Sequence, residues 1–207
     1  MDLATVDKLL TTTRTVRKRL DFTRAVDHEV IQMCLEIAIQ APTGGNIPRY
    51  HFVVVTDDAK RTAIASLYKR AYFEAYSPQR QAEVSQSDPR LIESATYLAE
   101  HMHQVPALIL PCVEAPQVQG TGPGAYASIL PATWSLMLAL RARGVGSAWT
   151  TLHLRYEKEA AALLGIPEGI QQAALLPVAY YTGEDFKPAK RMPARERTYW
   201  NGWGQKK

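Results

Sequence analysis

The sequence predicts a single domain that combines helices with β-strands, and three observations support this prediction. The chain has 207 residues and a mass of 23.1 kDa, which suits one domain with a substantial core. Hydrophobic residues make up 46% and charged residues 21% of it, an ordinary globular composition that argues against disorder. Segments with helical spacing alternate with short apolar runs typical of strands, and we find neither an internal repeat nor a domain linker.

Six segments carry the spacing or the capping residues of helices. Asp27, and Asp57 or Asp58, are plausible N-caps, because an aspartate side chain accepts hydrogen bonds from the free amides of a first helical turn. The segment after residue 124 is apolar nearly all round, so we expect burial on more than one side, with one face left for another subunit. The expected helices cover residues 2–12, 27–40, 57–72, 91–103, 125–143 and 155–164.

Three β-branched or apolar runs indicate strands. The first, residues 50–56 (YHFVVVT), has the composition of a central strand, and the others are residues 107–113 and 173–181. Residues 77–90 are polar and contain two prolines, so we expect a loop there that covers a functional site. Residues 117–124 are rich in glycine and also indicate a loop.

The formal net charge of +4 comes with three basic clusters, which are residues 14–24, Arg141 with Arg143, and residues 187–197. They are either solvated surface or, for two of them, the two sides of a site for a phosphate-bearing ligand. No basic face with interleaved aromatics and no nucleic-acid motif supports binding of DNA or RNA. The chain shows neither a membrane-spanning run nor an apolar signal segment, so we expect a cytoplasmic protein without a membrane partner.

The segment APTGGN, residues 41–46, lies between an expected helix and an expected strand. Pro42 stops the helix, because it lacks an amide proton and clashes with the preceding turn. The two glycines let the backbone approach another group closely, and the Asn46 amide can donate and accept hydrogen bonds together. These features predict a loop shaped around a flat polar ligand.

No metal site or covalent nucleophile stands out. Cys34 and Cys112 lie in apolar runs without CxxC spacing, so we expect them to be core residues. His101 and His103 would point to different faces of a helix, which argues against shared chelation. The patterns G-x-S-x-G, P-loop and H-E-x-x-H are absent from the sequence. We therefore expect no metal and no catalytic side chain.

Four segments resemble, in order and spacing, those of the FMN-dependent nitroreductase family. Each is weak alone, but the ordered set is fairly specific and spans about residues 10–195. The segments are R-T-V-R-K-R from Arg14, A-P-T-G-G-N from Ala41, G-V-G-S-A-W-T-T from Gly144 and K-P-A-K-R-M-P from Lys187.

The resemblance implies one FMN-binding domain over residues 1–207 with an α+β fold, in which helices flank a central, mainly antiparallel sheet. It also implies an intertwined homodimer with FMN at each of two interface sites. The tail, about residues 183–207, is basic and aromatic and has no core pattern of its own. Such a tail either frays or wraps a partner, and Tyr199, Trp200 and Trp203 favour wrapping around the other subunit.

The resemblance further implies which residues hold FMN. Arg14 and Arg17 would grip the phosphate bidentately with the Thr15 hydroxyl as a further donor, and Arg191 would join them from the tail. The APTGGN loop would meet the flavin ring edge from the opposite subunit, and an amide in the Trp149 segment would bond to flavin N5. A basic turn, a helix-stop loop or a helix end would explain each segment without a ligand. The implied contacts are Arg14, Thr15, Arg17, Pro42, Thr43, Gly44, Asn46, Trp149, Thr150, Thr151, Lys190 and Arg191.

The implied function is an FMN-dependent oxidoreductase. Hydride would pass from NAD(P)H through flavin N5 to a nitroaromatic or quinone by a ping-pong mechanism, with residues 77–104 as the lid that sets acceptor choice. One alternative is a protein of the same fold with a different flavin reaction, either oxygen-dependent destruction of the flavin or reductive dehalogenation. Another is an FMN-binding sensor or storage protein, which stays open because Asn46 is followed by I-P-R-Y where many family members have x-Q-P-W.

Overall fold

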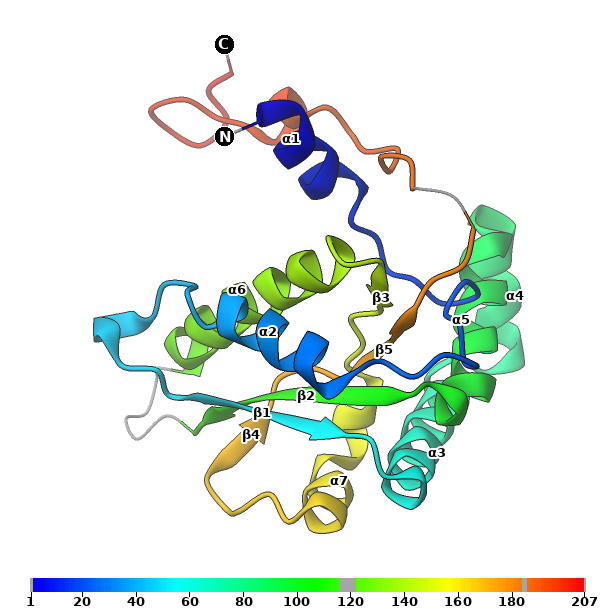
Figure 1. The fold of residues 1–207 in the computed structure, drawn as a ribbon. Helices are drawn as coiled ribbons and strands as arrows, with labels where there is room; N and C mark the ends of the chain where they lie inside the picture. The colour runs from blue at the N-terminus through cyan, green and yellow to red at the C-terminus, as the bar shows by residue number, and fades with distance from the viewer. Residues whose placement is uncertain (1, 116–121, 184–185, 207) are drawn as a thin grey trace.

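The computed structural model describes residues 2–115, 122–183 and 186–206. A five-stranded sheet lies between two layers of helices, and its named strands all pair antiparallel (Figure 1). The strand order is β1-β2-β5-β3, and β4 also pairs with β2. The predicted α+β fold is therefore confirmed. The strands are β1 (Tyr50–Val55), β2 (Ala107–Glu114), β3 (Val145–Ser147), β4 (Ile170–Gln172) and β5 (Leu176–Tyr180).

Helices cover both faces of this sheet. Helices α2 and α6 lie on one face, whereas α3 and α7 lie on the other (Figure 1). Hairpin α4–α5 extends from the second layer. The helices are α1 (Leu3–Thr12), α2 (His28–Ala38), α3 (Asp58–Ala75), α4 (Pro78–Ser87), α5 (Pro89–His101), α6 (Gly122–Arg141) and α7 (Glu157–Leu164).

Strand β2 is the centre of the core, because successive side chains of a strand point to opposite faces. Ala107 and Ile109 join the cluster under α2 and α6. Leu108, Leu110 and Cys112 join the cluster against α3, α5 and α7. Burial on both faces explains why the sequence of β2 is apolar without alternation.

The prediction that residues 50–56 form a central strand is wrong in one respect. Strand β1 does form there, but it pairs only with β2 within the described sheet and ends the strand order. His51 and Val54 are exposed on it. A β-branched run fits any pleated, half-buried surface, so composition alone did not separate an end strand from a central one.

Residues 77–90 form helix rather than the expected loop. They hold α4 and the start of α5, and each helix has a proline in its first turn. Ser77 and Asp88 accept hydrogen bonds from the amides of Arg80 and Leu91, so both helix starts are capped. Proline lacks only an amide that a first turn leaves unpaired, which is why these two prolines begin helices.

The expected loop at residues 117–124 lies largely outside the described residues. Gly122 and Gly124 belong to the first turn of α6, and residues 116–121 are not described. None of the described helices combines the length and apolar character that crossing a membrane requires.

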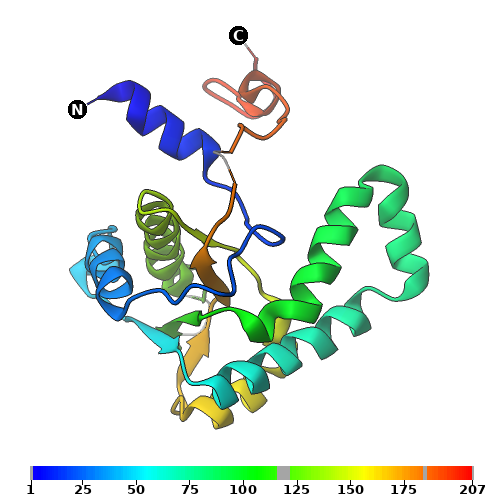
Figure 2. The same ribbon diagram turned by 45° about the vertical axis from the view of Figure 1, so that its right-hand side comes forward.

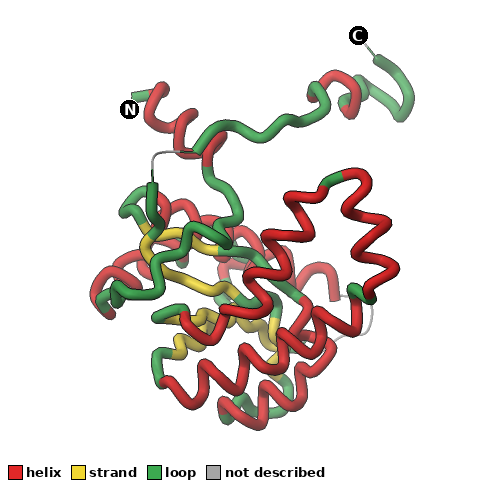
Figure 3. The backbone as a smooth tube through the Cα atoms, turned by 90° about the vertical axis from the view of Figure 1, so that its right-hand side faces the viewer, coloured by secondary structure: helices red, strands yellow, loops and turns green. Residues whose placement is uncertain are grey.

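Two parts of the chain project from the body. Helix α1 and the tail from residue 186 onward extend to one side, and hairpin α4–α5 extends beside them (Figures 2 and 3). Large apolar side chains are exposed on these parts, and Trp203 reaches 90% exposure. Water-facing tryptophan is unusual in a folded monomer, so these surfaces are candidates for an interface.

His153 generates a prediction about pH and stability. It is fully buried in the turn before α7, and burial lowers its pKa from 6.5 to about 4. Below pH 6.5 the unfolded chain takes up a proton that the folded protein does not, so stability falls as the pH falls toward 4. We expect this group to remove about 2 kcal/mol of the free energy of unfolding between pH 7 and about pH 5, measured by urea titration.

The control is His153→Gln, a side chain that does not titrate in this range. Its free energy of unfolding should vary less between the same two pH values, whatever its absolute stability. An equal pH dependence in both proteins would contradict a neutral, buried His153.

Candidate functional site

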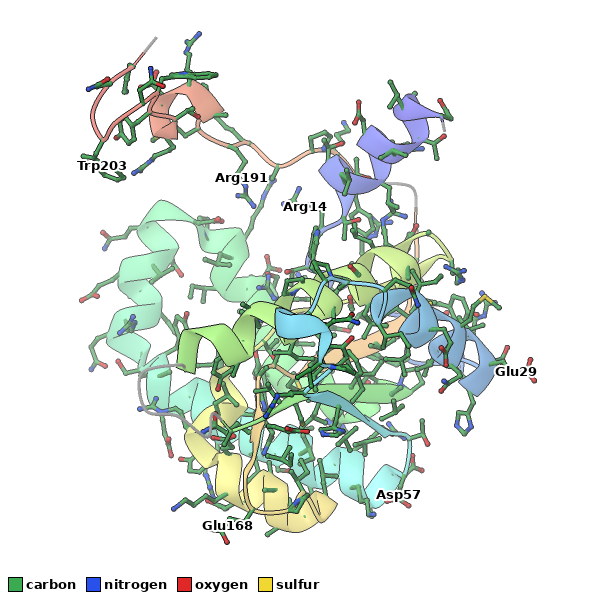
Figure 4. All side chains as sticks on the ribbon, turned by 90° about the vertical axis from the view of Figure 1, so that its left-hand side faces the viewer. Arg14, Glu29, Asp57, Glu168, Arg191 and Trp203 are labelled. Atoms are coloured by element: carbon green, nitrogen blue, oxygen red, sulfur yellow. The ribbon has the colours of Figure 1, made fainter. Side chains whose placement is uncertain are left out.

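An open cleft of about 580 Å³ lies where α1 and the tail meet the body. Figure 4 shows Arg14 and Arg191 close together at this place, with Arg14 on the body and Arg191 on the tail that passes over it. The cleft therefore brings together residues from opposite ends of the chain. Its lining residues are Leu10, Thr11, Thr13, Arg14, Thr15, Arg17, Trp134, Met137, Trp149, Pro188, Ala189 and Arg191.

The basic segment is fixed to the sheet by its backbone. The Val16 amide donates to the Ser147 carbonyl at 2.9 Å, and Thr15 forms a parallel bridge with Ser147. Val16 and Leu20 point into the core, whereas Arg14 is exposed. The segment thus lies along β3 with its apolar side chains inward and its arginines available to the cleft.

Gly146 makes this close packing possible. A Cβ atom there would lie 3.1 Å from the Val16 Cβ and 3.2 Å from the Leu20 Cδ2, tighter than ordinary van der Waals contact. Gly144 has φ +75°, a left-handed conformation that favours glycine, where α6 turns into β3. Both glycines of the G-V-G-S motif therefore have a structural role that also shapes the cleft.

The charge of the cleft suits an anion. Arg14, Arg17 and Arg191 line it, and no carboxylate is among the described lining residues. Arg14 Nη1 donates to the Lys187 carbonyl at 3.0 Å, and Arg17 Nη1 donates to Ser94 Oγ at 3.3 Å. Each guanidinium has five N–H groups in a planar fork, so further donors are left for phosphate oxygens. The residues present therefore fit the phosphate of FMN.

The residues after β3, from Trp149 to Thr151, differ in whether they face the cleft or pack in the core. Trp149 lines the cleft. Thr150 is buried, and both its amide and its hydroxyl donate to the Leu175 carbonyl, at 3.1 and 2.7 Å. The exposed Thr151 makes no backbone hydrogen bond through its amide within the described chain. The Trp149 amide makes none there either, so the amides of Trp149 and Thr151, rather than that of Thr150, can meet a ligand in this segment.

The APTGGN loop lies apart from the cleft in the same subunit. It forms a short turn, Gly44–Asn46, in which Gly45 and Asn46 have φ of 63° and 57°. The Gly44 amide donates to Ser128 Oγ of α6 at 3.1 Å, and the loop is mostly exposed. Of the twelve predicted contacts, the cleft gathers Arg14, Thr15, Arg17, Trp149 and Arg191. It does not gather Pro42, Thr43, Gly44, Asn46, Thr150, Thr151 and Lys190.

Sequence reasoning missed the apolar part of the lining. Trp134 and Met137 reach the cleft from α6, and Leu10 reaches it from α1. Trp134 is 39% exposed although it belongs to a helix that is otherwise largely buried. The one indication in the sequence was that α6 is apolar nearly all round. That pattern predicts burial on more than one side, but it does not say which side lines a cleft.

The sheet, the helical layers and the arginine-lined cleft define a protein of the α+β class with a cleft whose charge suits an anion. The chain belongs to the Nitroreductase family, whose model matches residues 10–180. A curated protein of Archaeoglobus fulgidus, named provisionally as an NADH dehydrogenase/NAD(P)H nitroreductase, is 26% identical over 200 residues. That alignment covers 95% of this chain and 97% of the relative.

Solved structures share the fold over almost the whole chain. The FMN- and NADPH-dependent nitroreductase NfnB of Sphigopyxis sp. strain HMH matches with a TM-score of 0.72 and 20% identity, covering 95% of this chain and 99% of that one. An iodotyrosine deiodinase bound to FMN and 3-iodo-L-tyrosine matches with a TM-score of 0.71 and 21% identity, covering 92% and 98%. These likenesses establish the fold.

The packing at Gly146 gives a testable prediction. In Gly146→Ala the new methyl group meets Val16 and Leu20, so the segment or the strand must shift. We expect a loss of about 1–3 kcal/mol in the free energy of unfolding, measured by urea titration. Gly124→Ala is the matched control, because nothing lies within 4 Å of a Cβ there and the residue is helical. Equal stability of the two variants would contradict the close approach.

Proposed function

We propose that the protein is a homodimeric FMN-dependent oxidoreductase that uses NAD(P)H to reduce small aromatic acceptors such as nitroaromatics and quinones. The observation that carries this proposal is the arginine-lined cleft. Arg14 and Arg17 come from the basic segment and Arg191 comes from the tail, and they converge without a carboxylate among the described lining residues. Membership of the Nitroreductase family supports a flavin as the phosphate-bearing ligand. The cytoplasmic location stays a prediction from sequence.

We assign the residues of the cleft by the part of FMN that suits their chemistry. The three arginines and the Thr15 hydroxyl hold the phosphate. The Thr151 amide, two residues after Trp149 and outside the lining of the cleft, donates to flavin N5. Trp134, Met137 and Trp149 offer an apolar wall on which a flat ring or acceptor can pack. FMN, when bound, supplies hydride transfer between NAD(P)H and the acceptor in ping-pong order.

The partner subunit is expected to complete this site. The APTGGN loop lies outside the cleft of its own chain, so we assign it to the flavin ring of the other subunit. The exposed apolar side chains of the tail support our proposal that it contributes to dimerisation. Met192, Trp200 and Trp203 are exposed on it. Residues 183–207 hold seven of the 24 basic and three of the 20 acidic residues, so the whole net charge of +4 belongs to the tail.

The proposed function is tested by the spectrum of the purified protein. We expect bound FMN, bleached without oxygen by NADPH or NADH and restored by a nitroarene or a quinone. Loss of the flavin itself in air, or dehalogenation of a halotyrosine without nitroarene turnover, would support the first alternative instead. Background turnover despite bound FMN would support a sensor or storage protein.

The phosphate assignment is tested separately by Arg14→Ala and Arg191→Ala. Each variant removes a charge-assisted contact worth about 1.5–3 kcal/mol, so the Kd for FMN should rise roughly 10- to 100-fold. Arg155→Ala is the control, since this exposed arginine changes the net charge equally but does not line the cleft. Unchanged affinity in both cleft variants would rule out the assignment.

The role of the tail is tested by deleting residues 195–207. The deletion removes Trp200 and Trp203, whose apolar surface is exposed in the single chain and would be buried by a partner. We expect a dimer that dissociates at higher protein concentration, measured by sedimentation, whereas deletion of residues 206–207 alone should have little effect. A truncated protein that stays fully dimeric at nanomolar concentration would refute the proposed wrapping.

A further inference from the structure

Two neighbouring residues of the basic segment contact two neighbouring residues of α5. Arg17 Nη1 donates to Ser94 Oγ at 3.3 Å. Lys18 Nζ forms an ion pair with Glu93. These contacts tie the phosphate-binding segment to hairpin α4–α5, which otherwise projects from the body (Figure 2). Because the two pairs are consecutive on both segments, a slip of α5 along the segment would break both of them.

The Ser94 hydroxyl is set up to accept a hydrogen bond. Its own proton goes to the Leu91 carbonyl one turn earlier in α5, at 3.1 Å. The oxygen lone pairs are therefore left for Arg17, and both side chains are half-buried. Two successive hydrogen bonds, from Ser94 to the Leu91 carbonyl and from Arg17 to Ser94, thus fix the Nη1 group of the Arg17 guanidinium.

The positive charge of Arg17 also acts on a side chain of α3. Tyr68 lies in the buried core of α3, and its burial raises its pKa to about 12, an effect that the positive charge of Arg17 opposes. The guanidinium is thus bonded to α5 while Arg17 lines the cleft. An arginine held in this way has lost much of its rotamer freedom before any ligand arrives.

We propose that Ser94 is a positioning residue that orients Arg17 for the phosphate of the bound flavin. This inference rests on the proposed function, since it takes FMN as the ligand. Ser94 holds one N–H of the guanidinium of Arg17, which lines the cleft, and the other N–H groups of the planar fork are left for the phosphate. Binding then costs less side-chain entropy, and the phosphate meets two donors in fixed geometry. Ser94 itself touches neither the phosphate nor the reacting ring.

The experiment compares FMN with riboflavin, which carries the same ring without the phosphate. In Ser94→Ala we expect the Kd for FMN to rise about fivefold, because one hydrogen bond that orients the phosphate-binding arginine is lost. The Kd for riboflavin should not change. Ser94→Thr should restore FMN affinity, since it keeps the hydroxyl. Ser66→Ala is the matched control, because its hydroxyl also bonds within a helix, to Thr62, but lies on the exposed side of α3.

A double-mutant cycle separates a positioning role from a general structural one. If Ser94 acts through Arg17, then Ser94→Ala should have no further effect on FMN affinity in the Arg17→Ala background. Equal losses for FMN and riboflavin, or additive losses in the double variant, would overturn the inference. FMN binding by the wild type with an unchanged Kd in Ser94→Ala would overturn the role of Ser94 alone. Failure of the wild type to bind FMN would overturn the proposed function together with this inference.

Discussion

The packing of the basic segment against β3 is the constraint on which the site depends. The amide of Val16 bonds to Ser147, and Gly146 leaves the space that Val16 and Leu20 fill. The same segment continues along the end of β5, where the Asp21 amide donates to the Tyr180 carbonyl at 2.7 Å. The backbone of residues 16–21 therefore bonds both to β3 and to the end of β5, from which the tail continues. Arg14 and Arg17 owe their places in the cleft to it.

The start of the tail, at Tyr181 and Phe186, is held by cation–π contacts with two arginines. The Arg19 guanidinium lies 4.1 Å from the Phe186 ring centroid and 5.5 Å from that of Tyr181, and Arg141 lies 5.0 Å from both centroids. Arg19 Nε also donates to the Thr182 carbonyl at 2.6 Å. Cation–π contacts and a backbone hydrogen bond together set the direction in which the tail leaves the body. Arg191 reaches the cleft because the chain before it is fixed in this way.

The sequence predicted those features of the fold that depend on neighbouring residues, and it did not predict those that depend on contacts distant in the chain. Local signals were sufficient for the helices that begin after Asp27 and Asp57, and for the strand at residues 50–55. The Asp57 side chain caps its helix by accepting from the Lys60 amide, whereas the Asp27 side chain makes no such bond. Local signals failed at residues 77–90, where the two prolines predict a loop but begin helices α4 and α5. The place of β1 at the end of the sheet and the contact of Ser94 with Arg17 depend on partners far away in the chain. Pairing at that distance leaves no trace in spacing or composition.

The separation of the APTGGN loop from the cleft bears on how the site is assembled. Within one chain the arginines and the apolar wall line the cleft beside the tail, whereas the loop is tied to Ser128 near the start of α6. If the loop serves the ring of the partner's flavin, as we propose, one ligand contacts both subunits. A ligand that binds only the assembled protein stabilises the assembly by mass action, so dimerisation and FMN affinity would strengthen each other. The tail would contribute to both, because Arg191 lines the cleft and the tryptophans beyond it are exposed in the single chain.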